Sequence, residues 1–444
     1  MSAGGASTAA AQGAEATALL QSLIRFDTVN PPGRERPAQE HLAAHLTAAG
    51  LDCELLGAEP ERPNLLARLR APEDAPPGPT LCYLGHVDTV LADPAEWTHG
   101  PWSGDLDDGF VWGRGALDMK SQVAAEVAAA AALARSGWRP QRGQLLICAV
   151  VDEETGGELG AQWLTRNHPE KARCDLLINE GGGSFFEYGG SRRYGVCVGE
   201  KGVFRFTITT DGVAGHASMP AMGDNALLKM GPLLDRFAAR RPGYRLTEEP
   251  LAFLAGIGED PADPDASIAR LRAADRRLAV FFEPMLGVTF TPTRISASEK
   301  VNVIPSRAVL KVDCRVPPGL GGQAVREDLA DVLGPQDGWQ LDFTEQVVGN
   351  RSPVTGELMD TISGWVAEQD PGARTVPVVL PGFTDSRHFR EAFPECVAYG
   401  FFPHRHQGLL DSAPLVHAAD ERIDVRDLAF ATGFFEDLAR RILG

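Results

Sequence analysis

Three short apolar runs, each ending in a polar cluster, constrain the fold of this chain more than any other feature. The runs are 80-TLCYLG, 144-QLLICAVV and 175-DLLIN, and none of them alternates apolar with polar residues. Unbroken runs of this kind are typical of strands that are buried on both faces. An alanine-rich segment near 120–135, closed by Gly137, predicts a helix between the first two runs. This order predicts an α/β fold with a mostly parallel sheet and helices on both faces.

The pattern changes near residue 195. Strand-like and helical segments then follow in the order β-α-β-β-α-β, at 203–212, 224–240, 293–298, 307–316, 323–333 and 340–347. This order predicts a ferredoxin-like α+β unit, an antiparallel sheet with two helices on one face. The α/β character returns after about 350, with a strand at 375–380 and an amphipathic helix at 425–443.

We therefore expect two domains, as the length of 444 residues also suggests. The catalytic domain would comprise residues 15–194 and 349–444. The inserted lid or dimerisation domain would comprise residues 195–348, in which 241–285 is partly rich in proline and aspartate and reads as an insertion. Residues 1–14 are rich in alanine, glycine and serine, which predicts a disordered tail.

Composition narrows the class of protein. The net charge of −18 argues against a nucleic-acid partner, which requires clustered lysine and arginine. The seven cysteines are scattered without a CxxC pair, a pattern that favours reduced, buried thiols. The N-terminal residues lack the basic and apolar regions of a secretory signal, and no apolar run is long enough for a membrane helix. We expect a cytoplasmic protein without a membrane partner.

The polar clusters predict a metal site. They are 85-GHVDTV, 151-VDEETGG and 178-INEGGG, with a fourth at 113-GRGALDMK. Ligands collect at the carboxyl ends of parallel strands, so these clusters can converge. Imidazole with several carboxylates suits zinc or another divalent first-row metal, and such dense carboxylates need cations to remain ionised together. Asp88 or Glu153 alone would indicate a surface turn or a helix N-cap, but four clusters at the ends of buried elements favour metal binding.

The clusters resemble the motifs of a family of two-metal metallopeptidases and deacylases. This family includes aminoacylase, acetylornithine deacetylase, succinyl-diaminopimelate desuccinylase and bacterial glutamate carboxypeptidase. The resemblance covers roughly residues 15–444 and extends, in the family's order, to 215-GHASMP, 302-NVIP, 313-DCR and 382-GFTDSRHF. It implies that His86 and Glu180 bind one metal, that Glu154 and His417 bind the other, and that Asp118 bridges both.

The resemblance also implies the catalytic roles. Asp88 would orient the imidazole of His86 through its other nitrogen, and Glu153 would be the general base. The Asp118–Met119 peptide would be cis. Two Zn²⁺ ions, with Co²⁺ or Mn²⁺ as alternatives, would turn a water into hydroxide near neutral pH. His216 would donate to the oxyanion, reaching the partner's site as in dimeric relatives; without the family context it would be a satisfied loop histidine.

Substrate contacts are implied at four further positions. Asn302 and Arg315 match positions that hold the substrate, and the planar fork of Arg315 suits a carboxylate. The alternative for Arg315 is an ion pair with Asp313. Gly382 and Thr384 would line the carboxylate pocket.

Three late histidines could provide the last metal ligand. His404, His406 and His417 are equivalent by residue type. The segment 417-HAADERI resembles the terminal histidine motif of the family, which selects His417.

These features predict a zinc-dependent amidohydrolase that acts on N-acyl amino acids or small peptides bearing a free carboxylate. The spacing of 96-EWTHGPWSG and the 241–285 insertion favour a carboxypeptidase- or dipeptidase-like enzyme, with an N-acyl-amino-acid deacylase as the alternative. A non-catalytic binding protein on the same fold is a remote alternative, because Glu153 and Asp118 are both retained. A homodimer formed through the inserted domain is expected.

Overall fold

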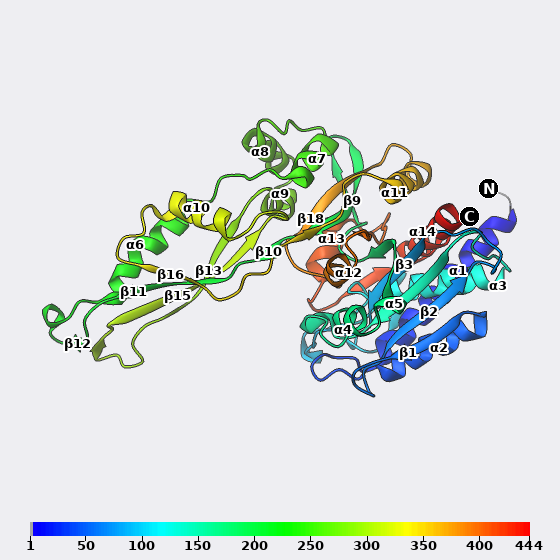
Figure 1. Cartoon of the computed structure of the whole chain (residues 1–444), viewed down its shortest axis with the longest axis horizontal. Helices are drawn as coiled ribbons and strands as arrows, with labels where there is room; N and C mark the ends of the chain where they lie inside the picture. The colour runs from blue at the N-terminus through cyan, green and yellow to red at the C-terminus, as the bar shows by residue number, and fades with distance from the viewer. Residues whose placement is uncertain (1–2) are drawn as a thin grey trace.

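The computed structural model describes residues 3–444, with side chains described from Gly13 onwards. The chain builds one large sheet and one smaller sheet that extends away from it (Figure 1). The large sheet has ten strands and contains the path β1-β2-β6-β3-β7-β19-β9-β17, with β8 and β18 also paired to β9. Its strands are β1 (Asp52–Leu56), β2 (Asn64–Arg70), β3 (Thr80–His86), β6 (Gln144–Val150), β7 (Leu176–Asn179), β8 (Phe185–Tyr188), β9 (Ser191–Glu200), β17 (Asn350–Arg351), β18 (Arg374–Leu380) and β19 (Val397–Gly400).

The centre of the large sheet is parallel, as expected from the three apolar runs. Strand β3 pairs in parallel with β6 and β7, and β7 pairs in parallel with β19. Antiparallel strands flank this centre: β2 pairs with β6, and β1 pairs with β2. The carboxyl ends of β3, β6 and β7 therefore lie at one edge of the sheet.

Helices cover both faces of the large sheet. Leu81 and Tyr83 of β3 belong to the core on one face, whereas Cys82 and Leu84 belong to the core on the other. The first core includes α1 (Ala3–Arg25), α2 (Arg36–Ala49), α3 (Lys120–Arg135), α11 (Glu357–Gln369) and α14 (Val425–Leu443). The second includes α4 (Ala161–Asn167), α5 (Pro169–Ala172) and α12 (Ser386–Ala392). No described helix is both long enough and apolar enough to cross a membrane.

The alanine-rich helix α3 packs closely against the sheet because its side chains are small. A Cβ atom on Gly85 would lie only 2.7 Å from Cγ2 of Val123 on this helix. Gly85 thus permits the close approach of β3 and α3, immediately before His86. The bounds of α3 match those expected from the sequence.

The first helix corrects the expectation of a disordered tail over residues 1–14. The structure describes α1 as starting at Ala3, while Met1 and Ser2 lie outside the described residues. Gly13 lies against Ala429 of α14, where an added Cβ would come within 2.6 Å of the alanine Cβ. An alanine-rich segment has high helix propensity, and this packing accounts for helix where composition suggested disorder.

The chain leaves the large sheet after β9 and re-enters it at β17. In between, β10 (Gly202–Val203), β11 (Phe206–Asp211), β13 (Thr289–Ser296), β15 (Arg307–Val316) and β16 (Gln340–Phe343) form a five-stranded antiparallel sheet. Helices α6 (Ala226–Ala239) and α10 (Gly322–Leu333) share a core with this sheet. The two-stranded pair β12 (Gly215–His216) and β14 (Val303–Ile304) lies at the far tip of this unit (Figure 1).

The 241–285 segment folds into three helices that pack against the large sheet rather than the smaller one. They are α7 (Glu248–Ile257), α8 (Pro264–Ala274) and α9 (Arg276–Phe282). Their apolar residues form a core with Val376 and Val379 of β18 and with Phe186 of β8. This insertion therefore forms a wall beside the large sheet (Figure 1).

Candidate metal centre

The three predicted clusters converge at one edge of the large sheet. Strand β3 ends at His86, β6 is followed by a short 3-10 turn at Glu153–Thr155, and β7 is followed directly by Glu180. Asp118 enters from the loop before α3. His417 enters from the loop before β20 (Arg422–Asp424), which pairs with β5 (Phe110–Trp112) and through it with β4 (Asp105–Asp107).

Five side chains form two groups of three that share Asp118. One group is His86, Asp118 and Glu180, the other is Asp118, Glu154 and His417, and within each group the ligand atoms lie within 4.8 Å of one another. The Nε2 atom of His86 is 3.1 Å from Oδ1 of Asp118. The Nε2 atom of His417 is 3.0 Å from Oδ2 of Asp118 and 3.2 Å from Oε2 of Glu154. These groups have the composition of the two metal sites that the motifs implied.

The electrostatics of the two histidines indicate a site built for positive charge. Hydrogen bonds to Asp118 and Glu154 raise the pKa of His417 to about 10. Burial lowers the pKa of His86, but hydrogen bonds to Asp118 and Asp88 outweigh this effect, so the pKa lies well above its usual value.

The pKa values of the carboxylates also indicate that the site carries an excess of negative charge. Burial, followed by the charge of Glu180, raises the pKa of Glu153, and burial together with the charge of Asp118 raises that of Glu180. The Oε1 atom of Glu154 is buried and has no hydrogen-bond partner. Leaving such an oxygen unpaired is costly, and a divalent cation would satisfy it.

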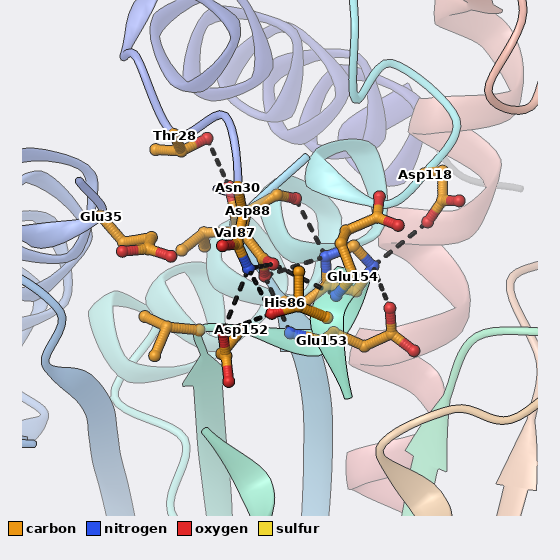
Figure 2. A network of polar contacts seen from close by, with 12 residues as sticks. Thr28, Asn30, Glu35, His86, Val87, Asp88, Asp118, Asp152, Glu153 and Glu154 are labelled. Carbon is orange, nitrogen blue, oxygen red and sulfur yellow. Dashed lines mark hydrogen bonds and ion pairs between the residues drawn. The ribbon is translucent and has the colours of Figure 1, made fainter. Parts of the chain in front are cut away.

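Asp88 positions both the histidine and the acidic turn (Figure 2). The nearest acceptor for Nδ1 of His86 is the backbone carbonyl of Asp88 at 3.0 Å, while the carboxylate Oδ1 lies at 3.5 Å. The two carboxylate oxygens accept the backbone N–H groups of Glu153 and Glu154, each at 3.2 Å. The contact to Nδ1 leaves Nε2 facing Asp118, as a metal-binding imidazole requires.

Two residues that support the site were not identified from the sequence. Asn30 donates from Nδ2 to Asp88 Oδ2 at 2.9 Å and lies 3.1 Å from Asp152 Oδ1, behind the acidic turn (Figure 2). Glu421 is buried and accepts the backbone N–H groups of Leu117 at 2.6 Å and Asp118 at 3.0 Å. It also pairs with Arg114 at 2.7 Å, and together these contacts fix the loop that carries Asp118. The Asp118–Met119 peptide in this loop is cis, as implied.

The structure does not bring His216 and Asn302 to the metal ligands of their own chain. Both lie at the tip of the smaller unit, where the backbone N–H of Ala217 bonds to the carbonyl of Asn302 at 3.1 Å (Figure 1). His216 is exposed, and its Nδ1 is 2.8 Å from the hydroxyl of Ser218.

Arg315 makes the ion pair that was the alternative to substrate binding. Its Nε lies 2.8 Å from Oδ1 of Asp313, and its Nη1 donates to the carbonyl of Pro381 at 3.2 Å. The second contact places Arg315 next to the loop that contains Gly382.

The 382-GFTDSRHF loop is only partly available to substrate. Thr384 lines the cavity at the site, but its hydroxyl is 2.6 Å from Oε1 of Glu200. Gly382 has no heavy atom within 4 Å of an added Cβ, so its surroundings are open. Asp385 is buried in the same loop, and burial raises its pKa to about 8.

Neither alternative histidine joins the ligand groups. His404 is buried, with Nδ1 at 3.3 Å from the hydroxyl of Ser184, and His406 donates its backbone N–H to Asp427 at 2.8 Å. Within residues 3–444, the only groups of histidine, cysteine and acidic side chains close enough to hold a metal are the two that share Asp118.

The fold and the site define the class of this protein: a metal-dependent hydrolase on an α/β scaffold with an inserted α+β unit. The chain belongs to peptidase family M20/M25/M40, whose sequence profile matches residues 82–441. This assignment confirms the resemblance and shows that the chain is an enzyme that hydrolyses amide or peptide bonds.

Relatives named as desuccinylases and relatives named as carboxypeptidases both match over most of the chain. A succinyl-diaminopimelate desuccinylase of Xanthobacter autotrophicus is 27% identical over 437 residues, covering 96% of this chain and 98% of the relative. A carboxypeptidase S-like protein of Dictyostelium discoideum is 24% identical over 384 residues, covering 81% and 71%. The M20 metallo-carboxypeptidase of Sulfolobus solfataricus is similar in structure, with a TM-score of 0.67 at 18% identity and coverage of 97% and 99%. A dinuclear metal-binding peptidase of the family from Bacillus subtilis has a TM-score of 0.59 at 15% identity and coverage of 98% and 99%.

Proposed function

We propose that this enzyme is a two-metal amidohydrolase that cleaves N-acyl amino acids or small peptides bearing a free carboxylate. The observation that carries the proposal is the pair of ligand groups sharing Asp118. His86, Asp118 and Glu180 would hold one cation, and Asp118, Glu154 and His417 the other. Mixed imidazole and carboxylate donors suit Zn²⁺, with Co²⁺ and Mn²⁺ as alternatives, and the unpaired Oε1 of Glu154 supports the fit.

Glu153 would be the residue that moves the proton. When bound, two divalent cations would polarise the scissile carbonyl and make a water more acidic. The Oε2 atom of Glu153 lies 4.0 Å from Nε2 of His86, beside both ligand groups but in neither. Its carboxylate would accept a proton from the attacking water and deliver it to the leaving nitrogen. Asp88 would keep Glu153 in position, because the carboxylate of Asp88 accepts the backbone N–H of Glu153.

The test is to measure bound metal and turnover on the same samples. Glu153→Gln should retain about two divalent ions per chain and lose most turnover, because only the proton carrier is removed. His417→Ala should lower the bound metal, whereas His406→Ala, a nearby histidine outside the site, should change neither quantity. A chain that binds no metal after reconstitution would refute the proposal.

Peptidase and deacylase activities would use the same residues and differ in the group that flanks the scissile bond. The first seven relatives in the sequence comparison are desuccinylases, while a carboxypeptidase S-like protein and several peptidase structures also match. We propose peptidase activity, since 96-EWTHGPWSG and the 241–285 insertion resemble the peptidase-like branch of the family. Amine release from matched N-acetyl amino acids and dipeptides separates the two, and a faster rate on the N-acyl series would reverse the preference. Two bound metals without turnover of either series would leave the metal site standing and mean that the substrate lies outside both series.

The dimer and the cellular compartment are also proposals. The exposed position of His216 at the tip of the smaller unit supports a dimer in which this residue reaches the partner's site, and a one-chain mass in light scattering would contradict it. All seven cysteines are free and six are buried, which supports a reducing compartment such as the cytoplasm. Cell fractionation would test the compartment.

A further inference from the structure

The cavity that reaches the candidate metal ligands extends beyond them along apolar side chains. Its volume is about 580 Å³, and it is lined by Asp118, Glu153 and Glu180 together with many apolar side chains. A cavity of this size can enclose much of a drug-sized molecule. The apolar part of the cavity therefore bears on which substrates the enzyme accepts.

Helix α9 of the insertion supplies one apolar wall. Val280, Phe281 and Phe282 all line the cavity. The ring centroid of Phe282 lies 4.6 Å from that of Phe186 and 4.7 Å from that of Phe253, so α9 is anchored by aromatic contacts. This wall is a fixed part of the fold.

Several wall residues are apolar yet exposed. Val280 is 65% exposed, Phe281 is 37% exposed and Val416 is 38% exposed, and all three line this one cavity. Exposed apolar side chains scattered singly need no explanation, but a group of them around a cavity indicates a binding surface. An apolar group of the substrate would remove these side chains from water.

The charges around the cavity disfavour a second acidic group on the substrate. Among the described residues that line it, none is lysine or arginine. His404 also lines the cavity; its Nε2 is buried without a partner, and burial lowers the pKa of the ring. Two arginines approach one edge: Arg315 donates to the Pro381 carbonyl at 3.2 Å, and Arg387 lies 4.6 Å from the centre of the Phe383 ring. This edge can serve one carboxylate, and no lysine or arginine lines the apolar wall to pair with a second.

The apolar part of the cavity, here called the α9 chamber, is formed by Phe186, Val280, Phe281, Phe282, Val378 and Phe402. We propose that the α9 chamber selects substrates that carry a long or bulky apolar group and rejects those with a second carboxylate, such as a succinyl group. This inference rests on the proposed amidohydrolase function. The apolar group is either the acyl chain or the amino-acid side chain, and the experiment distinguishes the two.

The experiment measures kcat/KM of the metal-loaded full-length enzyme on two series. The first is N-acetyl-, N-butanoyl-, N-octanoyl- and N-succinyl-alanine; the second is N-acetyl-glycine, -leucine and -phenylalanine. Burial of methylene groups should raise kcat/KM at least tenfold from acetyl to octanoyl, or from glycine to phenylalanine, according to which group enters the chamber. Butanoyl and succinyl have the same chain length, so the terminal carboxylate alone should lower kcat/KM about tenfold or more.

A variant ties the preference to α9. Phe281→Arg should lower kcat/KM for the best apolar substrate at least tenfold and raise it for the succinyl substrate. Leu251→Arg is the matched control, because Leu251 lies on α7, is 40% exposed and does not line the cavity. Its kcat/KM values should match those of the wild type.

The outcomes separate this inference from the proposed function. Turnover with no apolar preference, or with a succinyl preference, would overturn the inference and leave the amidohydrolase function standing. No turnover of these substrates or of the matched dipeptides would overturn the function instead. Calorimetric titration with N-octanoyl- and N-succinyl-alanine, and with N-acetyl-phenylalanine, would then decide the inference. Equal or absent binding of all three probes overturns it, and tighter apolar binding that Phe281→Arg abolishes supports it.

Discussion

Subunit exchange provides a sharp test of how the active site is completed. His216 lies at the tip of the smaller unit, while the metal ligands lie at the edge of the large sheet (Figure 1). If His216 serves the partner's site, a His216→Ala chain keeps its metals and its base but deprives its partner of a donor. A Glu153→Gln chain lacks the base but still offers the donor. Neither homodimer then contains a complete site.

The expected magnitude follows from two-fold symmetry. Each homodimer should lose activity by about 10²-fold or more, because it lacks either an oxyanion donor or a proton carrier. In a mixed dimer, one of the two sites has both groups. Random exchange of equal amounts makes about half of the dimers mixed, so activity should recover to about one quarter of the wild-type value.

The assay is amine release after the two variants are co-expressed with different tags or exchanged in solution. Activity that stays at the sum of the two homodimers would refute the trans arrangement and indicate that the inserted unit closes on its own chain. Full activity of the His216→Ala homodimer would refute any role for this residue. As a control, mixing His406→Ala with Glu153→Gln should give about one half of wild-type activity, since every His406→Ala chain contributes a complete site.

Three further predictions concern the chemistry and the buried carboxylates. Glu153→Gln should lower kcat by about 10²- to 10⁴-fold with little change in bound metal, as measured by elemental analysis beside the rate. Glu421→Gln should destabilise the protein by about 3–5 kcal/mol in denaturant unfolding, because Arg114 would lose its buried charge partner. Burial raises the pKa of Glu126 to about 8, above its usual 4.5, so its contribution to stability is present below pH 4.5 and is lost as the pH rises to 8. Glu126→Gln should therefore remove a slope of about 1.4 kcal/mol per pH unit from the unfolding free energy in that window.

Each of these has a result that would contradict it. Loss of metal in Glu153→Gln would show that the base and a ligand had been exchanged. Glu368→Gln removes an exposed pair with Arg441 and should change the free energy of unfolding little, so an equally small change for Glu421→Gln would show that the buried pair does not stabilise the fold. An unchanged pH slope in Glu126→Gln would show that this carboxyl is not protonated in the folded state.

The sequence predicted the centre of the fold because its strongest signals are local. Unbroken apolar runs identified β3, β6 and β7, and alanine content identified α3 with its observed bounds. The antiparallel strands β1 and β2 were missed, since a segment such as 64-NLLARLR mixes polar and apolar residues and fits a helix as well as a strand. The helical conformation from Ala3 was missed because composition alone does not reveal packing such as that between Gly13 and Ala429.

The candidate site shows the same division between local and distant information. The ligands could be named because each follows a recognisable motif. The role of Glu421 could not, since it depends on a contact with Leu117, which lies 304 positions away in the chain. Asn30 likewise meets Asp88 only after folding, although it stands in the conspicuous 30-NPPG turn. Such supporting residues carry no sequence pattern of their own.

Chemistry and substrate choice reside on separate parts of this molecule, and this separation has a physical cause. Three candidate ligands, His86, Glu154 and Glu180, lie at or just after the carboxyl ends of β3, β6 and β7, so their positions are fixed by pairing in the centre of the sheet. The α9 wall instead attaches to the side of the sheet through Phe186, Phe253 and Phe282, and it lies in an insertion between strands of the other sheet. Changes in α9 can therefore alter the apolar chamber without moving a ligand. Substitutions there should change the ranking of substrates by kcat/KM while the number of bound metal ions stays constant.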